Sequence, residues 1–186
     1  MSVLPVLEGR QLRLRAPTRE DLSRLQRWYA DPELVAPFDR FSSDSFTELA
    51  LGVESAPSDP TSLAPRFMLE RKSDRLAVGC VGHYRPHPVL EFVDVWYLIA
   101  EPSARGQGLG KEAVGLLVDH LFHTETLERV GATCDVENTA SYRLVEGLGF
   151  RREGTMSSAL FHHGRWHDVA FYGVTRPEWA ARPRPS

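Results

Sequence analysis

The stretch ARGQGLGKEA, residues 104–113, places glycine at every second position and then changes to residues that favour a helix. An apolar run of strand type precedes it, and a segment of helical periodicity follows it. Glycine lets the backbone bend sharply and approach a bulky group, because it has no Cβ atom. The first N–H groups of a helix lack internal partners and carry partial positive charge. The stretch therefore predicts a strand-to-helix turn that binds an anion.

Two common phosphate-binding loops do not fit the spacing of these glycines. A dinucleotide fingerprint, G-x-G-x-x-G, would need glycine where Lys111 stands. A nucleoside-triphosphate loop, G-x-x-x-x-G-K-[ST], would begin at Arg105 and end at Glu112, and neither residue fits. The remaining pattern is R-x-x-G-x-G, formed by Arg105, Gly108 and Gly110. A glycine-rich helix entry without a ligand is the alternative interpretation.

The composition of the chain predicts one folded domain. Of its 186 residues, 42% are hydrophobic and 25% are charged, with a net charge of −3. We expect the domain to span residues 1–179, followed by a disordered tail at 180–186. No cluster of Lys and Arg indicates a nucleic-acid partner, and no apolar run is long enough for a membrane span. Cys80 and Cys134 lie in apolar runs typical of buried free thiols. Such thiols suit a reducing, cytoplasmic compartment, and no signal peptide is expected.

Periodicity along the chain predicts an α/β fold of the α+β type, built on one mixed, mostly antiparallel sheet of about seven strands with helices on both faces. A strand around Leu12 precedes a helix that begins near Thr18 with a capping box. A second helix is expected at 46–53 and a loop at 55–65. The remaining predicted strands are 67–71, 76–84, 90–100, 130–136, 151–161 and 166–174, with helices following the glycine turn and Asn138.

Two further stretches carry a resemblance to a known family. They are ENTASYRLVEGLGFRREG, residues 137–154, and GRWHDVAFYGVTRPEW, residues 164–179. Together with the R-x-x-G-x-G turn, they resemble the GCN5-related N-acetyltransferase (GNAT) family, and within it the RimJ/RimL type that acetylates ribosomal-protein N-termini. The resemblance covers nearly the whole chain and is weakest between about residues 40 and 65. It implies an acyltransferase (EC 2.3.1.-) with a single-domain GNAT-like fold.

The resemblance implies acetyl-coenzyme A as cosubstrate, bound where strands 90–100 and 130–136 splay apart. The pyrophosphate would contact backbone N–H groups of the glycine turn, and the pantetheine arm would pair with the edge of the first strand. A backbone N–H of that strand would polarise the acetyl carbonyl. The expected cofactor-binding residues are Leu98, Ile99, Ala100, Arg105, Gly106, Gln107, Gly108, Leu109, Gly110, Lys111, Asn138 and Ser141.

The group that assists the departing sulfur is expected in the helix after residue 138. Many relatives use a tyrosine there, but Val145 occupies its position in this chain. Ser141 matches a serine of the RimJ/RimL-like branch and is the expected catalytic residue, with the adjacent Tyr142 ranked lower. Asn138 is also a preferred helix N-cap, and Ser141 could make only a local hydrogen bond, so structural roles remain open for both residues.

The general base is less well defined by the sequence. Relatives often carry a glutamate on the strand before the glycine turn, and the register from Arg105 places that position near Val95. Asp94 and Glu91 lie close by, and a β-bulge could direct either towards the site. Either acid could instead be a solvated strand residue. An α-amine acceptor, with a pKa of about 7.7–8.0, would need little help from a base.

The histidines at 162, 163 and 167 do not predict a metal site. They straddle an expected turn, and no cysteine or carboxylate in the local pattern completes a tetrahedral ligand set. We therefore expect no metal in this protein.

The sequence thus favours an enzyme that moves acetyl from acetyl-coenzyme A to a primary amine by direct attack in a ternary complex. The acceptor would be a protein N-terminus or a small molecule, with no nucleic-acid or membrane partner. A homodimer is one expected assembly, because dimers are frequent in the family. Two alternatives remain: a non-catalytic module that binds acyl-coenzyme A, and an interaction domain without a cofactor.

Overall fold

The computed structural model describes residues 4–35, 67–87 and 89–183 of the chain. The helix predicted at 46–53 and the loop predicted at 55–65 lie outside the described residues. None of the helices in the described part is long and apolar enough to cross a bilayer.

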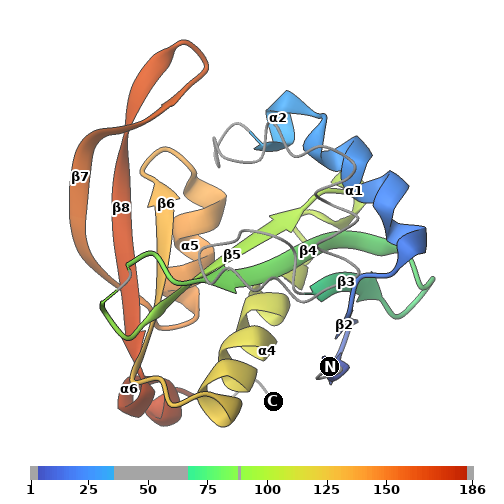
Figure 1. Ribbon diagram of the computed structural model, residues 1–186, viewed down its shortest axis with the longest axis horizontal. Coiled ribbons are helices and arrows are strands. Elements are labelled where there is room, and N and C mark those ends of the chain that lie inside the picture. Colours follow the sequence, from blue (N-terminus) through green and yellow to red (C-terminus); the bar gives the residue numbers. More distant parts are fainter. Residues whose placement is uncertain (1–3, 36–66, 88, 184–186) are drawn as a thin grey trace.

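The strands form one eight-stranded sheet in the order β1-β2-β3-β4-β5-β6-β8-β7 (Figure 1). Among the described strands, only β5 and β6 run parallel to each other, and all other neighbours are antiparallel. The mixed, mostly antiparallel sheet was predicted from the sequence, which indicated about seven strands. The strand bounds are β1 Leu7–Glu8, β2 Leu12–Arg15, β3 Phe67–Arg71, β4 Ala77–Tyr84, β5 Val93–Ile99, β6 Arg129–Asp135, β7 Arg151–His162 and β8 Arg165–Thr175.

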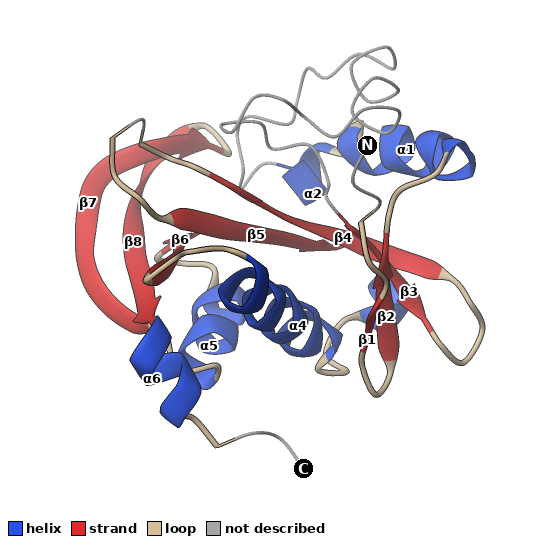
Figure 2. Cartoon of the chain, turned by 60° about the horizontal axis from the view of Figure 1, so that its bottom comes forward, coloured by secondary structure: helices blue, strands red, loops and turns tan. Residues whose placement is uncertain are grey.

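Helices cover both faces of the sheet (Figures 1 and 2). On one face lie α1 (Leu22–Tyr29) and α2 (Pro32–Val35), and on the other lie α4 (Leu109–Thr124) and α5 (Thr139–Gly147). The short α6 (Arg176–Ala181) follows β8 directly. Because α6 includes residues 180 and 181, helical structure extends two residues into the predicted tail.

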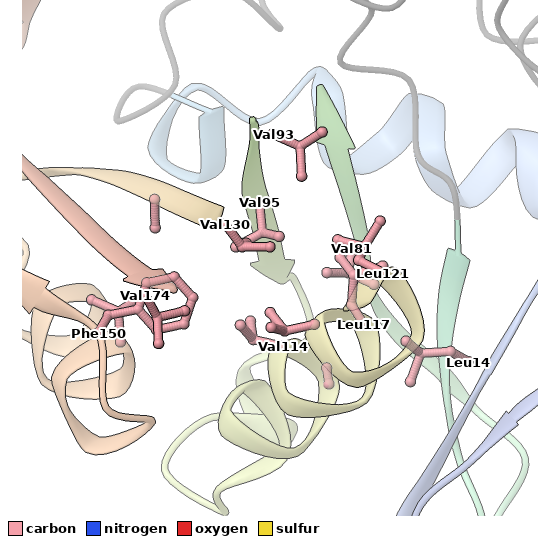
Figure 3. Packing of buried hydrophobic residues seen from close by; sticks show 14 of the residues in the cluster. Leu14, Val81, Val93, Val95, Val114, Leu117, Leu121, Val130, Phe150 and Val174 are labelled. Carbon is pink, nitrogen blue, oxygen red and sulfur yellow. The ribbon is translucent and has the colours of Figure 1, made fainter. Parts of the chain in front are cut away.

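The central strands alternate their side chains between two cores, as period-2 patterning requires. Val93 and Val95 of β5 pack with Leu117 of α4 in the larger core (Figure 3). Trp96, the residue after Val95, points to the opposite face and packs with Leu25 of α1 in the smaller core. Each fully buried aliphatic side chain of this kind contributes roughly 1.5–3 kcal/mol, so both layers of helices are held to the sheet mainly by apolar burial.

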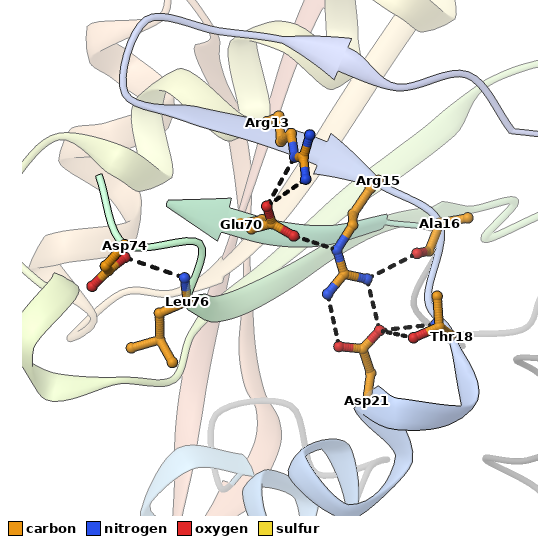
Figure 4. A network of polar contacts seen from close by, with 8 residues as sticks. All are labelled: Arg13, Arg15, Ala16, Thr18, Asp21, Glu70, Asp74 and Leu76. Atoms are coloured by element: carbon orange, nitrogen blue, oxygen red, sulfur yellow. Dashed lines mark hydrogen bonds and ion pairs between the residues drawn. The ribbon is translucent and has the colours of Figure 1, made fainter. Parts of the chain in front are cut away.

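A polar network joins β2 and β3 to the 3-10 turn (Arg19–Asp21) that precedes α1 (Figure 4). The Arg15 guanidinium donates to both Asp21 oxygens, at 2.7 and 2.9 Å, and to Glu70 at 2.7 Å. Arg13 donates to the other Glu70 oxygen at 2.9 Å. Asp21 also closes the predicted capping box by accepting from the backbone N–H and hydroxyl of Thr18. The network fixes the start of α1 over the sheet.

The feature that opens the sheet lies between β5 and β6. These parallel strands pair only at Val93↔Val130 and Asp94↔Gly131. Beyond these pairs β5 continues beside β4, and β6 continues beside β8. The two halves of the sheet therefore diverge on the carboxyl side of Asp94, where the sequence predicted a cleft.

Candidate functional site

The glycine-rich turn lies at the start of α4, and the space beside its first two glycines is open. Gly106 and Gly108 have φ angles of +72° and +78°, a region that side chains with a Cβ rarely adopt. A Cβ added at either position would meet nothing within 4 Å. The open space and the free N–H groups of the first helical turn fit a phosphate group. The residues present therefore fit the pyrophosphate of a coenzyme A molecule.

The Arg105 side chain turns back from the glycine turn towards the end of β5. Its Nε donates to the carbonyl of Ile99 at 3.1 Å, and its Nη2 donates to the carbonyl of Ala100 at 3.3 Å. In this arrangement the arginine braces the turn against the strand, and the backbone of the turn is left to face the cleft.

The turn opens into a cleft with a volume of about 1010 Å³ between the two halves of the sheet. Most of the cofactor-binding residues predicted from the sequence line this cleft, and only Ala100 and Gln107 among them do not. Asp94 also lines it, whereas Glu91 does not. The predicted residues in the lining are Leu98, Ile99, Arg105, Gly106, Gly108, Leu109, Gly110, Lys111, Asn138 and Ser141.

The register of β5 decides which backbone groups face the cleft. The N–H of Ala100 donates to the carbonyl of Val78 at 2.9 Å, so Ala100 is bonded towards β4. Backbone groups alternate direction along a strand, so Leu98 also faces β4, and Tyr97 and Ile99 face β6. The edge available to an extended ligand is therefore offered by Tyr97 and Ile99.

A group of three polar side chains lies on the α5 side of the cleft. The hydroxyl oxygens of Tyr97 and Ser141 are 2.7 Å apart, and the Cys134 sulfur is 3.1 Å from that of Ser141. Asn138 caps α5 by accepting the backbone N–H of Ser141 at 3.1 Å, which was one of its two predicted roles. Val145, at the tyrosine position of many relatives, is fully buried in the core. Sequence reasoning missed Tyr97, whose position becomes apparent only when β5 is placed beside α5.

Asp94 lies on the opposite face of the sheet. It alternates with Val93 and Val95 and is 6% exposed. The Thr133 hydroxyl donates to its Oδ2 at 2.9 Å. Gly131 makes room for the carboxylate, because a Cβ there would come within 2.1 Å of Asp94 Oδ1. Burial raises the pKa of Asp94, and the hydrogen bond from Thr133 opposes that rise only in part.

Glu91, the second predicted candidate for the base, lies outside this arrangement. Its side chain is 85% exposed and forms an ion pair with Arg85 at 3.2 Å. The structure therefore brings Asp94, but not Glu91, to the point where β5 and β6 separate.

Charges of both signs line the cleft. Arg105 and Lys111 come from the glycine turn and the start of α4, and Arg143 comes from α5. Acidic side chains come from Glu33 of α2 and from Asp94 and Asp135 of the central strands. The lining can thus contact both an anionic and a cationic ligand.

Comparisons with known proteins agree with this geometry. Residues 11–151 match the model of the acetyltransferase (GNAT) domain family. An uncharacterized N-acetyltransferase, YoaA of Bacillus subtilis (strain 168), is 23% identical over 94% of this chain and 99% of its own.

Two solved structures share the fold. Spermidine N-acetyltransferase from Vibrio cholerae, in complex with CoA and spermine, has a TM-score of 0.78 and 23% identity over 91% of this chain and 98% of its own. RimJ from Mycobacterium smegmatis, in complex with CoA-disulfide, has a TM-score of 0.71 and 26% identity over 93% of this chain and 85% of its own.

The family match extends over most of the chain and includes the glycine turn, both strands of the cleft and α5. The resemblance recognised from the sequence is therefore confirmed, and with it the GNAT fold and the enzyme class. This chain belongs to the GNAT acetyltransferase family and is an N-acetyltransferase that uses acetyl-coenzyme A.

Proposed function

We propose that this enzyme acetylates a cationic primary amine by direct attack on acetyl-coenzyme A in a ternary complex. The proposal rests on one observation. At the opening between β5 and β6, polar side chains lie on both faces of the sheet. Asp94 and Thr133 lie on the α1 face, and Tyr97, Ser141 and Cys134 lie on the α5 face. A base on one face and a hydrogen-bonding group on the other suit attack and departure from opposite sides of an acetyl group.

Asp94 takes the proton of the incoming ammonium in this proposal. A buried carboxylate with a raised pKa is a stronger proton acceptor than a solvated one, provided that it is ionised. Its ionised form also attracts the cationic amine before the proton is transferred. Thr133 donates to Oδ2 and leaves Oδ1, the oxygen nearest Gly131, without a hydrogen bond from a described residue.

Ser141 stabilises the departing thiolate of coenzyme A. Its hydroxyl can receive a hydrogen bond from Tyr97 and donate its own hydrogen to the sulfur. Burial raises the pKa of Tyr97, so this hydroxyl stays protonated and able to donate. The pair would replace the tyrosine that Val145 displaces from α5.

The acceptor is a protein N-terminal α-amine or a small-molecule amine. Acidic residues in the cleft lining favour a cation, and the relatives include a spermidine acetyltransferase crystallised with spermine. An α-amine has a pKa of about 7.7–8.0 and a lysine side chain about 10.4, so the α-amine is far easier to deprotonate at neutral pH. Both cysteines are unpaired and buried, which favours action in the reducing cytoplasm.

The direct test is to follow thiol release with acetyl-coenzyme A and a panel of amines. The panel should contain peptides with free N-termini, polyamines and amino-acid derivatives, each beside an N-blocked analogue. Turnover that disappears on blocking the amine supports the proposal. Cofactor binding without turnover on any amine would instead support a non-catalytic acyl-coenzyme A module.

A site test uses two identical substitutions. Gly108→Glu places a carboxylate in front of the helix start at a φ of +78°, so we expect coenzyme A affinity to fall by at least about 100-fold. Gly154→Glu adds the same side chain to open space on β7, outside the cleft, and should bind normally. Equal affinity of the two variants in calorimetry would contradict the placement of the pyrophosphate.

A further inference from the structure

Three buried side chains of β6, β7 and β8 converge on one face of the sheet. Asp135 of β6 pairs with Val169 of β8, and His167 stands two residues before Val169 on the same face. His167 in turn pairs with Leu160 of β7, and His162 stands two residues beyond Leu160. The strand register therefore sets Asp135, His167 and His162 on a diagonal across three strands.

The donor atoms of these side chains lie close together. Asp135 Oδ2 is 2.7 Å from His162 Nε2 and 3.0 Å from His167 Nδ1. One donor atom from each of the three residues lies within 4.8 Å of the other two. The side chains of Asp135, His162 and His167 are 4%, 8% and 3% exposed. Two imidazoles and a carboxylate are ligands that zinc prefers.

We propose that Asp135, His162 and His167 bind one divalent transition-metal ion of the zinc type. Bonds of about 2.0–2.1 Å in a tetrahedral site put neighbouring donors about 3.3 Å apart. The separations from Asp135 Oδ2, 2.7 Å to His162 and 3.0 Å to His167, are shorter than that value, so the donors would move apart by about 0.3–0.6 Å to admit the ion. The two rings stack with their centroids 3.7 Å apart and 19° between their planes, so both imidazoles lie side by side next to the carboxylate.

The ring nitrogens of His167 also point to a bound ligand. Neither ring nitrogen makes a hydrogen bond with the described residues, although both are buried. Nδ1 is near Asp135 Oδ2, but the contact lacks hydrogen-bond geometry. Buried polar atoms are bonded in the great majority of cases, and exceptions often mark an ion or a water molecule. A metal ion on Nδ1 would satisfy the nitrogen that faces the carboxylate.

The other two ligands are already oriented by neighbouring groups, as is usual around bound metals. His162 Nδ1 lies 2.9 Å from His163 Nδ1, and this contact directs Nε2 towards Asp135. The backbone N–H of Glu137 donates to Asp135 Oδ1 at 2.7 Å, which leaves Oδ2 facing the histidines. Three protein ligands leave one coordination position open, and Asp135 belongs to the cleft lining.

The ion would join the β7–β8 hairpin to the end of β6, beside the cleft. The spacing of the histidines alone does not reveal the site, because the carboxylate lies 27 residues before His162 in the chain. This role does not depend on the acetyl-transfer chemistry, so it can be tested without a substrate.

The experiment uses untagged full-length protein stripped with a chelator and titrated with Zn²⁺ and with Co²⁺. We expect one ion per chain by calorimetry and a visible Co²⁺ absorption band typical of four-coordinate nitrogen and oxygen ligation. The Tm should rise by about 5–10 °C at a hundredfold excess of free ion over the Kd. Asp135→Asn and His162→Ala should each weaken binding by at least about 100-fold.

His123→Ala is the matched control, because this exposed histidine on α4 lies outside the cluster and should leave binding unchanged. Circular dichroism verifies that each variant is folded. Absence of stoichiometric binding to the wild-type protein would overturn the proposal, whatever the variants do. It would also be overturned if the folded Asp135→Asn and His162→Ala variants bound the ion as tightly as His123→Ala.

Discussion

Buried carboxylates in the two halves of the sheet have different hydrogen-bond partners. On the β2–β3 side, each carboxylate oxygen of Asp21 and Glu70 accepts a hydrogen bond from an arginine side chain. At the opening between β5 and β6, Asp94 accepts a hydrogen bond from one hydroxyl. Asp135 accepts one from a backbone N–H, is hydrogen-bonded to His162, and lies 3.0 Å from His167 without hydrogen-bond geometry. None of these cleft partners is a permanent cation. The first pair of carboxylates is neutralised within the fold, and the second pair can still act on a cationic ligand.

The pKa directions at Asp21, Glu70 and Asp94 follow this contrast. Burial opposes ionisation of Asp21 and Glu70, but hydrogen bonds from Arg15 outweigh it and lower both pKa values. Burial also dominates at Asp94, where one hydroxyl is too little compensation, and its pKa is raised. Asp135 differs from Asp94: burial opposes its ionisation too, but the backbone N–H of Glu137 and the contact with His162 lower its pKa. A carboxylate whose charged form is stabilised by its surroundings contributes to folding stability. A carboxylate whose charged form is destabilised by burial is suited to take up a proton.

The largest effect should come from removing the carboxylate at the cleft. We expect Asp94→Asn to lower kcat by about 10²- to 10⁴-fold, because the proton acceptor is lost while the shape is kept. Glu91→Gln should retain near-wild-type turnover, since Glu91 is exposed and paired with Arg85. Steady-state kinetics on the best amine of the panel distinguishes the two candidate bases. A larger loss in Glu91→Gln than in Asp94→Asn would reverse the assignment.

The same substitution should not weaken the fold. Because the folded-state pKa of Asp94 is raised, its contribution favours folding below the unfolded pKa and is lost as pH rises through the folded pKa. At neutral pH the buried charge is a cost that Asn does not carry. We therefore expect a Tm of Asp94→Asn equal to or above the wild-type value at pH 7, with the gain disappearing in acid. A large loss of Tm at pH 7 would show that Asp94 serves the fold instead.

We expect the next largest effect at Asp21, where a substitution should lower stability and leave activity nearly unchanged. Asp21→Ala leaves the partly buried Arg15 with one carboxylate and removes the capping box of the 3-10 turn before α1, so we expect a loss of about 3 kcal/mol in the free energy of unfolding. Urea unfolding measures it, and kcat at a temperature where the variant is folded should change little. Asp74→Ala removes an exposed partner of Arg71 and should barely shift the urea midpoint.

The pH dependence of this network also has a defined sign. The lowered pKa values of Asp21 and Glu70 mean that their stabilisation is present above the unfolded pKa values and is lost as pH falls through the folded ones. Wild-type protein should therefore lose stability in acid, and Asp21→Ala should lose less of it over the same range. Parallel curves for the two proteins would contradict the role assigned to the network.

The sequence predicts the parts of this enzyme that lie within single contiguous segments. The glycine turn and the cap at Asn138 follow from local spacing, since each depends on one strand-to-helix junction. Ser141 follows from the resemblance of residues 137–154 to the family. The contacts that give those residues their chemistry come from pairing across the sheet. Asp94 and Thr133 are 39 positions apart, and Tyr97 and Ser141 are 44 apart.

Strand register sets these distant contacts, and where no hairpin turn joins two strands, neither strand's own sequence fixes their register. The extra β1 strand was missed for a similar reason, because it has only two residues and is defined by its pairing with β2. The sequence thus predicts which segments build the site, and the sheet decides which side chains meet there.

The smallest effect should come from the α5 face, where the Tyr97 hydroxyl lies within hydrogen-bond distance of both the hydroxyl and the backbone carbonyl of Ser141. We expect Ser141→Ala and Tyr97→Phe each to lower kcat by about 2- to 10-fold, the value of one hydrogen bond, with little change in coenzyme A affinity. If tyrosine acts only through the serine, the double variant should be no slower than Ser141→Ala alone, and the cycle measures that coupling. Additive losses would mean that the two hydroxyls act separately. Unchanged turnover in Ser141→Ala would leave the serine as part of the α5 cap, and the cleft would then rely on Asp94 alone.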